Sequence, residues 1–191
     1  QGKFQVHQRK KEIVLTFDDG PQEYTNDVLD ILKQENVPAV FFLIGKNIAL
    51  HETIVKRMHD EGHQLGNHSF EHSAHFDWQS SSKMLKEMHS TSDAITAITG
   101  ETVTLFRPPY GVTNPMLAQA IKNSGLKSIG WSIRSMDTVA KDAEKLKAKI
   151  IKQLKPGAII LLHDRCSITK AILPDLIQTI KKNGYEIVRL P

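Results

Sequence analysis

Short apolar runs alternate along the chain with longer segments in which apolar residues recur every three or four positions. The short runs are bounded by Gly, Pro, Asn or Asp, which is typical of buried strands, whereas the longer spacing is typical of amphipathic helices. The expected strands are 13–17, 39–44, 64–67, 103–106, 126–132, 158–162 and 185–188. The expected helices are 24–32, 48–60, 84–98, 115–123, 142–154 and 173–182.

This alternation predicts an α/β protein with parallel strands, because a helix crosses over between successive strands. No linker, repeat or low-complexity tract interrupts it, so we expect residues 1–191 to form one domain. The alternation alone fits a barrel and a doubly wound sheet. Polar residues follow several strands, and a ring of strands brings such ends together, whereas an open sheet gathers ligands at one switch point. The pattern therefore favours a barrel.

Two adjacent carboxylates, Asp18 and Asp19, end the first strand in the motif TFDDG. Acidic residues in a turn often serve turn formation alone. Because side chains of adjacent residues diverge, separate roles are easier than joint binding of one ion. In that interpretation one carboxylate binds a metal and the other accepts a proton from water. A phosphatase of the Asp-x-Asp type requires an intervening residue, so the spacing argues against it.

Two histidines, His68 and His72, lie four residues apart in the motif HSFEH after the third strand. In a helical turn both rings would project from one face and bind the same metal ion. The chain has nine histidines, so an accidental core or surface pair is the alternative. An acidic third ligand favours the metal site, since two histidines and one carboxylate leave a position open for water, as in catalytic zinc sites.

Three further residues complete a candidate acid–base set. Arg107 precedes two prolines that stiffen the backbone, and its guanidinium is suited to hold a carboxylate ionised; a surface arginine in a stiff loop is the alternative. His163 ends the most apolar strand, where a core histidine is the alternative to a general acid. Asp137 follows another strand and is placed to raise the pKa of His163.

Composition sets broad limits on function. An apolar share of 40% and a charged share of 24% are ordinary for a globular protein. A net charge of +4 suits an anionic polymer such as a cell wall, and we expect no nucleic-acid partner. The single cysteine, Cys166, excludes an intrachain disulfide and is expected to be inert. We expect no transmembrane segment, since no apolar run approaches about 20 residues, and we see no secretory signal at Gln1.

Taken in order, the motifs TFDDGP, HSFEH, RPPYG and LLHD resemble those of the polysaccharide deacetylase family, carbohydrate esterase family 4. The resemblance runs from about Ile13 to Leu190, and AVFFLIG at 39–45 is similar to the family's second strand. It implies a single-domain distorted (β/α) barrel with about seven parallel strands. Residues 1–191 would then be one polysaccharide-deacetylase-like (NodB homology) catalytic domain.

The resemblance also implies a role for each candidate residue. Its metal would be a divalent cation, zinc in the first place, with cobalt or nickel as alternatives. The implied roles are metal ligand for Asp19, His68 and His72, general base for Asp18, general acid for His163, orientation of Asp18 for Arg107, tuning of His163 for Asp137, an oxyanion-binding backbone N–H for Tyr110, and the wall of the acetyl-methyl pocket for Leu161.

One motif departs from the family pattern. The family commonly has Asp-x-x-Asp-Trp after its fifth strand, and this chain has RSMDT at 134–138. Asp137 matches the second Asp, so tuning of His163 is expected to be retained. Arg134 replaces the first Asp and Thr138 replaces a tryptophan of the acetate pocket, so the resemblance does not fix the preferred substrate.

The expected function is that of a metal-dependent hydrolase that removes N-acetyl groups from an N-acetylated glycan of the peptidoglycan or chitin type and releases acetate. The alternatives are an O-acetyl-xylan esterase, a small-molecule amidase on the same site, and a non-catalytic glycan-binding protein. The expected partner is an N-acetylated polysaccharide or oligosaccharide, and a monomer is compatible with the sequence. The substrate class implies an extracytoplasmic or cell-envelope location.

Overall fold

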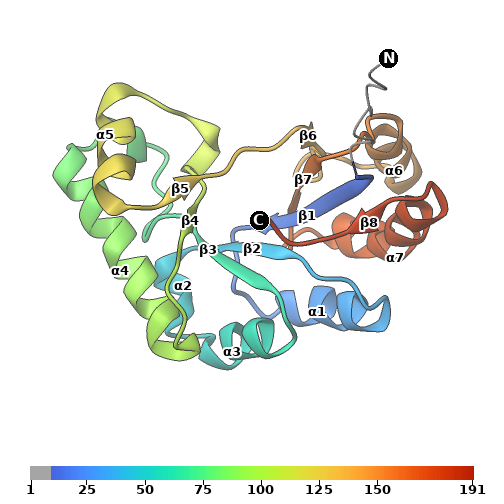
Figure 1. The fold of residues 1–191 in the computed structure, drawn as a ribbon, viewed down its shortest axis with the longest axis horizontal. Helices are drawn as coiled ribbons and strands as arrows, with labels where there is room; N and C mark the ends of the chain where they lie inside the picture. Colours follow the sequence, from blue (N-terminus) through green and yellow to red (C-terminus); the bar gives the residue numbers. More distant parts are fainter. Residues whose placement is uncertain (1–9) are drawn as a thin grey trace, which may run out of the picture.

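A single parallel sheet organises residues 10–191, which the computed structural model describes (Figure 1). Seven strands lie in the order β5-β4-β3-β2-β1-β7-β6, and β8 pairs with the first two residues of β1. The predicted α/β class with about seven parallel strands is confirmed; residues 1–9 of the expected domain lie outside the described residues. The strands are β1 (Glu12–Asp18), β2 (Val40–Leu43), β3 (Gln64–Asn67), β4 (Leu105–Phe106), β5 (Lys127–Ser128), β6 (Ile133–Arg134), β7 (Ala158–His163) and β8 (Glu186–Ile187).

Helices cover the outer face of the curled sheet, with α4 and α5 beyond β4 and β5 and with α6 and α7 beyond β1 and β7 (Figure 1). Side chains that accept backbone N–H groups begin three of them, Ser80 for α4, Asn114 for α5 and Asp142 for α6. The helices are α1 (Thr25–Gln34), α2 (Gly45–Ile48), α3 (Glu52–Asp60), α4 (Ser81–Thr99), α5 (Pro115–Ser124), α6 (Ala143–Lys152) and α7 (Ser167–Lys182), with short 3-10 turns η1 (Phe76–Trp78) and η2 (Pro109–Gly111).

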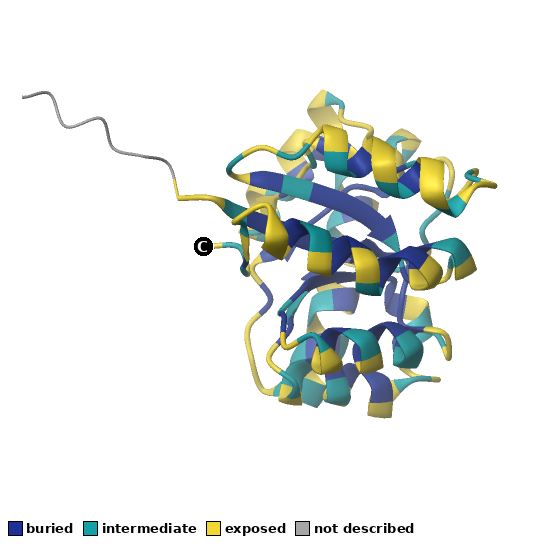
Figure 2. Cartoon of the chain, turned by 90° about the vertical axis from the view of Figure 1, so that its right-hand side faces the viewer, coloured by how far each residue is buried: buried dark blue, intermediate teal, exposed yellow. Residues whose placement is uncertain are grey.

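Strand alternation divides the core into two layers. On β1, Ile13, Leu15 and Phe17 belong to the large cluster between sheet and helices, whereas Val14 points to the inside of the curl. Figure 2 shows the buried strands covered by helices whose outward positions are exposed. The inner cluster fills the curl near the amino ends of the strands; its buried members are Val14, Val40, Phe42, Leu105 and Ile129. Polar residues occupy the same inner face nearer the carboxyl ends.

The predicted strand 126–132 is wrong in its extent: only Lys127–Ser128 (β5) is a strand, and residues 129–132 connect it to β6. At one end of this connection, Ile129 donates its N–H to Phe106 O at the β4 edge, and at the other Ser132 donates to Ile159 O of β7. The segment therefore crosses from one edge of the sheet to the other. The segment closes the barrel, but β5 and β6 do not pair with each other, so the ladder of hydrogen bonds is interrupted there. This interruption is what makes the barrel distorted.

Two helix predictions also need correction. The expected helix 48–60 is shorter: it is α3, from Glu52 to Asp60, because α2 already ends at Ile48 and the backbone of His51 is not helical (φ −138°, ψ 35°). The expected helix 173–182 begins earlier, at Ser167. It continues through Pro174 because buried side chains on both sides of the proline pack one face of the helix on the core. Apolar spacing continues across the first break, so periodicity did not reveal it. None of the helices within residues 10–191 has the length and hydropathy to cross a membrane.

Close packing inside the curl predicts a specific cost for a single added methyl group. A Cβ at Gly66 would lie 2.6 Å from the Phe42 ring, whereas a Cβ at Gly130 would meet nothing within 4 Å. We expect Gly66→Ala to lower the free energy of unfolding by about 1–3 kcal/mol. Gly130→Ala is the matched control and should be neutral or slightly stabilising. Urea unfolding of both variants measures this, and equal stabilities would contradict the packing.

Candidate active site

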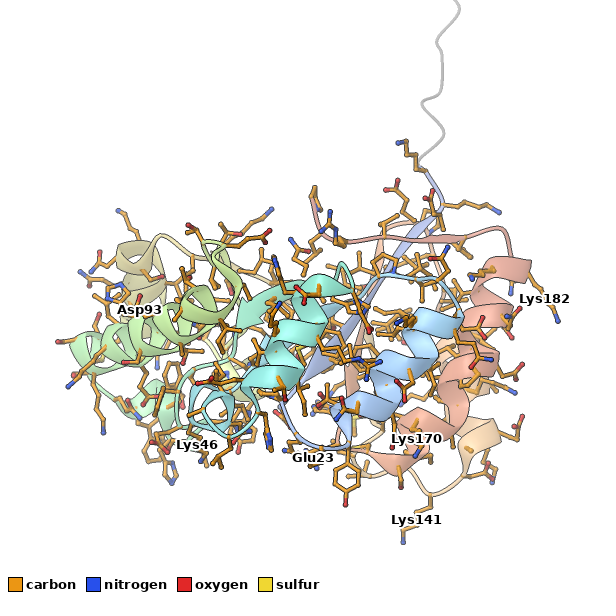
Figure 3. All side chains as sticks on the ribbon, turned by 90° about the horizontal axis from the view of Figure 1, so that it is seen from below. Glu23, Lys46, Asp93, Lys141, Lys170 and Lys182 are labelled. Atoms are coloured by element: carbon orange, nitrogen blue, oxygen red, sulfur yellow. The ribbon has the colours of Figure 1, made fainter. Side chains whose placement is uncertain are left out.

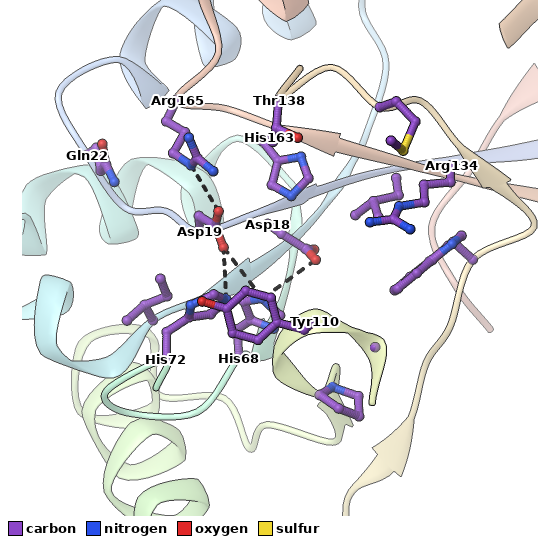
Figure 4. Close-up of a pocket in the computed structure, with 16 residues that line it drawn as sticks. Asp18, Asp19, Gln22, His68, His72, Tyr110, Arg134, Thr138, His163 and Arg165 are labelled. Atoms are coloured by element: carbon purple, nitrogen blue, oxygen red, sulfur yellow. Dashed lines mark hydrogen bonds and ion pairs between the residues drawn. The ribbon is translucent and has the colours of Figure 1, made fainter. Parts of the chain in front are cut away.

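The carboxyl ends of β1, β3, β4, β6 and β7 surround one open pocket of about 410 Å³, a size typical of small-molecule sites (Figure 4). Polar side chains converge there because inward-facing positions of neighbouring parallel strands share one edge. The lining residues include Asp18, Asp19, Gln22, His68, His72, Tyr110, Trp131, Arg134, Met136, Thr138, Leu161, His163 and Arg165. The strand ends that the sequence singled out therefore do meet.

Arg107 lies under the pocket with 0% of its surface exposed. Its Nη1 donates to Asp18 Oδ1 and to Thr16 Oγ1, both at 2.8 Å. Its Nε and Nη2 donate to the carbonyl oxygens of Ile129 and Gly130. These contacts exclude the alternative of a surface arginine. They fix the Asp18 carboxylate and tie the crossing segment 129–130 to β1.

Asp19, His68 and His72 form the one group of three metal-competent side chains found among residues 10–191. Asp19 Oδ1 lies 3.5 Å from His68 Nε2 and 3.3 Å from His72 Nε2. The four-residue spacing suggested a helical turn between the histidines, but the structure has none there. The backbones of Ser69 (φ 65°) and His72 (φ 53°) are left-handed. The two rings meet because this turn folds back, with ring centroids 4.8 Å apart.

The polarity of these atoms fits a bound cation. His68 Nδ1 lies 2.6 Å from the carbonyl oxygen of Arg107, which only accepts, so Nδ1 carries the hydrogen. In the neutral imidazole, Nε2 is then a lone-pair acceptor, and it faces Asp19 Oδ1, a buried atom without a hydrogen-bond partner. Acceptors that face one another in a buried space are satisfied by a shared proton or by a metal cation between them. Two imidazoles and a carboxylate are a suitable ligand set.

The surroundings hold these groups in the forms that bind metal. Burial would raise the pKa of Asp19, but hydrogen bonds and charges from His68, Arg165 and His163 lower it below the ordinary value. Burial, together with the charge of His68, lowers the pKa of His72. An ionised carboxylate and a neutral imidazole are the ligand forms of these residues.

His163 and Asp137 form a second pair on the opposite wall. His163 Nδ1 lies 2.8 Å from Asp137 Oδ1, and Asp137 Oδ2 accepts the His163 backbone N–H and the Thr169 hydroxyl. Burial lowers the pKa of His163, but the hydrogen bond and charge of Asp137, with the charges of Asp18 and Asp19, raise it overall. The pair resembles an oriented acid–base histidine, with Nε2 left for the pocket.

Tyr110 and Leu161 lie at the rim and the wall of the pocket. The Tyr110 ring packs on the His72 ring at 4.9 Å between centroids, and its backbone is left-handed (φ 58°). Leu161 is 5% exposed and lines the pocket beside Trp131. A Cβ at Gly111 would lie 2.3 Å from the Trp131 indole, so glycine is required for this close approach. These side chains give the pocket an apolar, aromatic side.

Sequence reasoning missed two residues of the site. Arg165 donates from Nε to Asp19 Oδ2 at 3.0 Å, and Trp131 forms part of the wall. Arg165 follows the LLHD motif directly, which was the available signal. Asp164, the residue before Arg165, is 2% exposed and accepts a hydrogen bond from Thr25 Oγ1 at 2.7 Å. Burial raises the pKa of Asp164 to about 7. The Asp164 Oδ2 atom would lie 2.4 Å from a Cβ at position 20. The carboxyl group therefore packs directly against Gly20 and leaves no room for a side chain in the TFDDG turn.

A sequence profile described as polysaccharide deacetylase matches residues 5–129. A peptidoglycan-N-acetylglucosamine deacetylase, PgdA, of Listeria monocytogenes is 38% identical over 181 residues. That match covers 94% of this chain and 38% of the relative, so the chain spans well under half of the relative's length.

Solved structures of the same family share the fold. A family 4 carbohydrate esterase from Streptomyces lividans, in complex with acetate, superposes with a TM-score of 0.89 at 31% identity, covering 95% of this chain and 93% of that one. A family 4 pseudoenzyme from Bacillus anthracis superposes with a TM-score of 0.87 at 28% identity, covering 95% of this chain and 64% of that one. The chain belongs to the polysaccharide deacetylase family.

The ligand geometry predicts which histidine controls metal binding. Zinc at one hundred times its dissociation constant should stabilise the protein by about 2.7 kcal/mol, seen as a rise in Tm of several degrees. His72→Ala should abolish that rise because it removes a ligand, whereas His75→Ala, on the same loop but outside the cluster, should retain it. Thermal unfolding with and without zinc measures both; an equal response in the two variants would disprove the ligand set.

Proposed function

We propose that this protein is a metal-dependent deacetylase that removes N-acetyl groups from a glycan of the peptidoglycan or chitin type and releases acetate. The observation that carries the proposal is the position of Asp18. Its carboxylate is fixed by Arg107 and lies beside the Asp19–His68–His72 cluster, with Oδ2 3.6 Å from His68 Nε2. A carboxylate base beside a cation site is the arrangement that metal-assisted hydrolysis requires. The family membership and the PgdA relative support the substrate class.

Asp18 acts in this proposal as the general base. A divalent cation held by Asp19, His68 and His72 would supply Lewis acidity, which acidifies water and polarises a carbonyl. Asp18 takes the proton of the attacking water, because it is the carboxylate beside the cluster that Arg107 keeps oriented. Asp19 remains a ligand, since Arg165 and the two histidines surround it. The adjacent carboxylates thereby serve separate roles.

His163 acts as the general acid on the other side of the substrate. Asp137 accepts its Nδ1–H, which leaves Nε2 to donate a proton to the departing amine nitrogen. Leu161, two residues earlier on the same face of β7, would contact the acetyl methyl group. The backbone N–H of Tyr110 would stabilise the developing oxyanion, an interaction typically worth about 3–4 kcal/mol. Acetate and a free amino sugar are the products.

The proposal has finer parts and alternatives. Zinc is the preferred ion, because two imidazoles and one carboxylate match its catalytic sites. Residues 1–191 act as one catalytic domain, and an N-acetylated wall glycan as substrate places it outside the cytoplasm or in the cell envelope. An O-acetyl esterase, a small-molecule amidase and a non-catalytic glycan-binding protein are the competing outcomes of the test. The complete set of base, acid and ligand residues argues against the last of these.

Acetate release from chitooligosaccharide, peptidoglycan and acetyl-xylan by the zinc-loaded protein tests the reaction. We expect acetate from an N-acetylated glycan, and Asp18→Asn should lower kcat by about 10²–10⁴-fold because the base is lost. Zinc content, measured by atomic emission, should remain one equivalent in that variant. Acetate from acetyl-xylan alone would indicate the esterase, and tight glycan binding without acetate would indicate the binding protein.

The His163–Asp137 pair makes a pH prediction. The general acid must be protonated, so kcat/KM falls as pH rises through the pKa of His163, which Asp137 raises. Asp137→Asn keeps an acceptor for Nδ1–H but removes the charge, so the alkaline limb of the profile should move to lower pH. His163→Ala should remove that limb together with most activity. An alkaline limb at the same pH in wild type and Asp137→Asn would disprove the pairing.

A further inference from the structure

A cation without a partner faces the pocket. Arg134 is exposed and lines the pocket, and its guanidinium makes no hydrogen bond or ion pair with any of residues 10–191. In Figure 4 its guanidinium points inward, toward the side where Asp18 and His163 lie. The nearby carboxylates have other cations: Asp18 pairs with Arg107, and Asp137 pairs with His163. Arg134 therefore brings a positive charge that the protein itself does not neutralise.

The sheet fixes where this charge stands. Arg134 pairs in register with Leu161 on β7, and its neighbour Ile133 is buried in the core between sheet and helices. Arg134 thus shares the inward face with Leu161 and His163. Residues two apart on one strand are separated by about 6.5–7 Å. If the acetyl group binds beside Leu161 as proposed, a guanidinium at this position lies on the side of the pocket where substituents of that sugar or of the adjoining sugar would be.

The wall beside it suits a sugar ring. Trp131 is partly exposed in the pocket and is held in place by its close contact with Gly111 and by Arg107, whose guanidinium carbon lies 5.7 Å from the indole centroid. The indole and the Arg134 fork belong to one short segment. Aromatic faces pack against sugar rings, and an arginine fork binds a carboxylate through two parallel hydrogen bonds.

We propose that Arg134 recognises a carboxylate on the glycan, so that this enzyme prefers an acidic N-acetylated substrate over a neutral one. The inference rests on the proposed function and names its substrate class. Arg134 is a specificity residue here. It does not touch the atoms that react, and its effect falls mainly on KM. Salt should weaken the preference, because the contact is between charges at an open pocket.

The test compares substrates that differ in charge alone. One pair is the disaccharide of N-acetylglucosamine and N-acetylmuramic acid and its carboxamide; the second pair is a hyaluronan tetrasaccharide, whose carboxylates are on the rings of the neighbouring sugars, and its carboxamide. We expect kcat/KM of the wild type to favour the acidic member of at least one pair. Arg134→Gln should reduce that ratio at least tenfold, and Arg134→Lys should restore part of it. The pair that responds identifies the source of the carboxylate.

Lys182→Gln is the matched control, since it removes one positive charge at the far end of α7, away from the pocket (Figure 3). It should leave the ratio unchanged. An equal ratio in wild type and Arg134→Gln for both pairs would overturn the inference.

Binding separates this failure from failure of the proposed function. Titration of the Asp18→Asn protein with the acidic disaccharide and its carboxamide needs no turnover, and it should show the same preference and the same loss in the Asp18→Asn, Arg134→Gln double variant. No acetate from any glycan would reject the deacetylase proposal while leaving this binding preference measurable. Equal affinity for the two ligands would reject the role of Arg134 even in an active enzyme.

Discussion

The buried guanidinium of Arg107 is the contact on which both the barrel and the site depend. It lies over the Phe42 ring, 4.2 Å from the centroid, at the boundary between the apolar filling of the curl and the polar residues above it. Breaking a buried ion pair typically costs about 3–5 kcal/mol, because one charge is left without a partner. One nitrogen, Nη1, binds Thr16 and Asp18, while the rest of the group binds the crossing segment. The same side chain therefore closes the barrel and orients Asp18, the proposed base.

Local backbone strain is concentrated at the same place. Six non-glycine residues among 10–191 have a left-handed backbone, and five of them lie in the loops that form the pocket: Asp19, Ser69, His72, Tyr110 and Met136. Such conformations cost on the order of 1–3 kcal/mol each when the side chain is unfavourable there, and they persist where the surroundings impose them. Here they turn carboxylates and imidazoles toward a common point. The unpartnered acceptor at Asp19 is a further cost that binding of a cation would remove.

The sequence predicted the strands and the polar residues that end them, because both follow from periodicity and from the geometry of parallel strands. It did not predict how the chain moves between elements. The end of the strand at Ser128 depends on Arg107, which comes 22 residues before Ile129 in the chain and binds carbonyl groups of the segment that follows β5. The chain folds back between His68 and His72 because the backbone of Ser69 is left-handed, and a spacing of four residues does not reveal this conformation. Arg165 and Trp131 were missed because their partners are remote in sequence.

The residues proposed to carry out the reaction and those proposed to select the substrate lie on different parts of the fold. The proposed base, ligands and acid come from the ends of β1, β3 and β7, which pack directly on the two core layers, and Arg107 follows β4. The wall that carries Trp131 and Arg134 is the crossing segment and the short strand β6. Asp137 anchors the end of this wall to His163 and Thr169 through three hydrogen bonds. Substitutions at 134 would therefore change the charge at the pocket wall while the hydrogen bonds between Asp137 and His163 keep the proposed acid oriented.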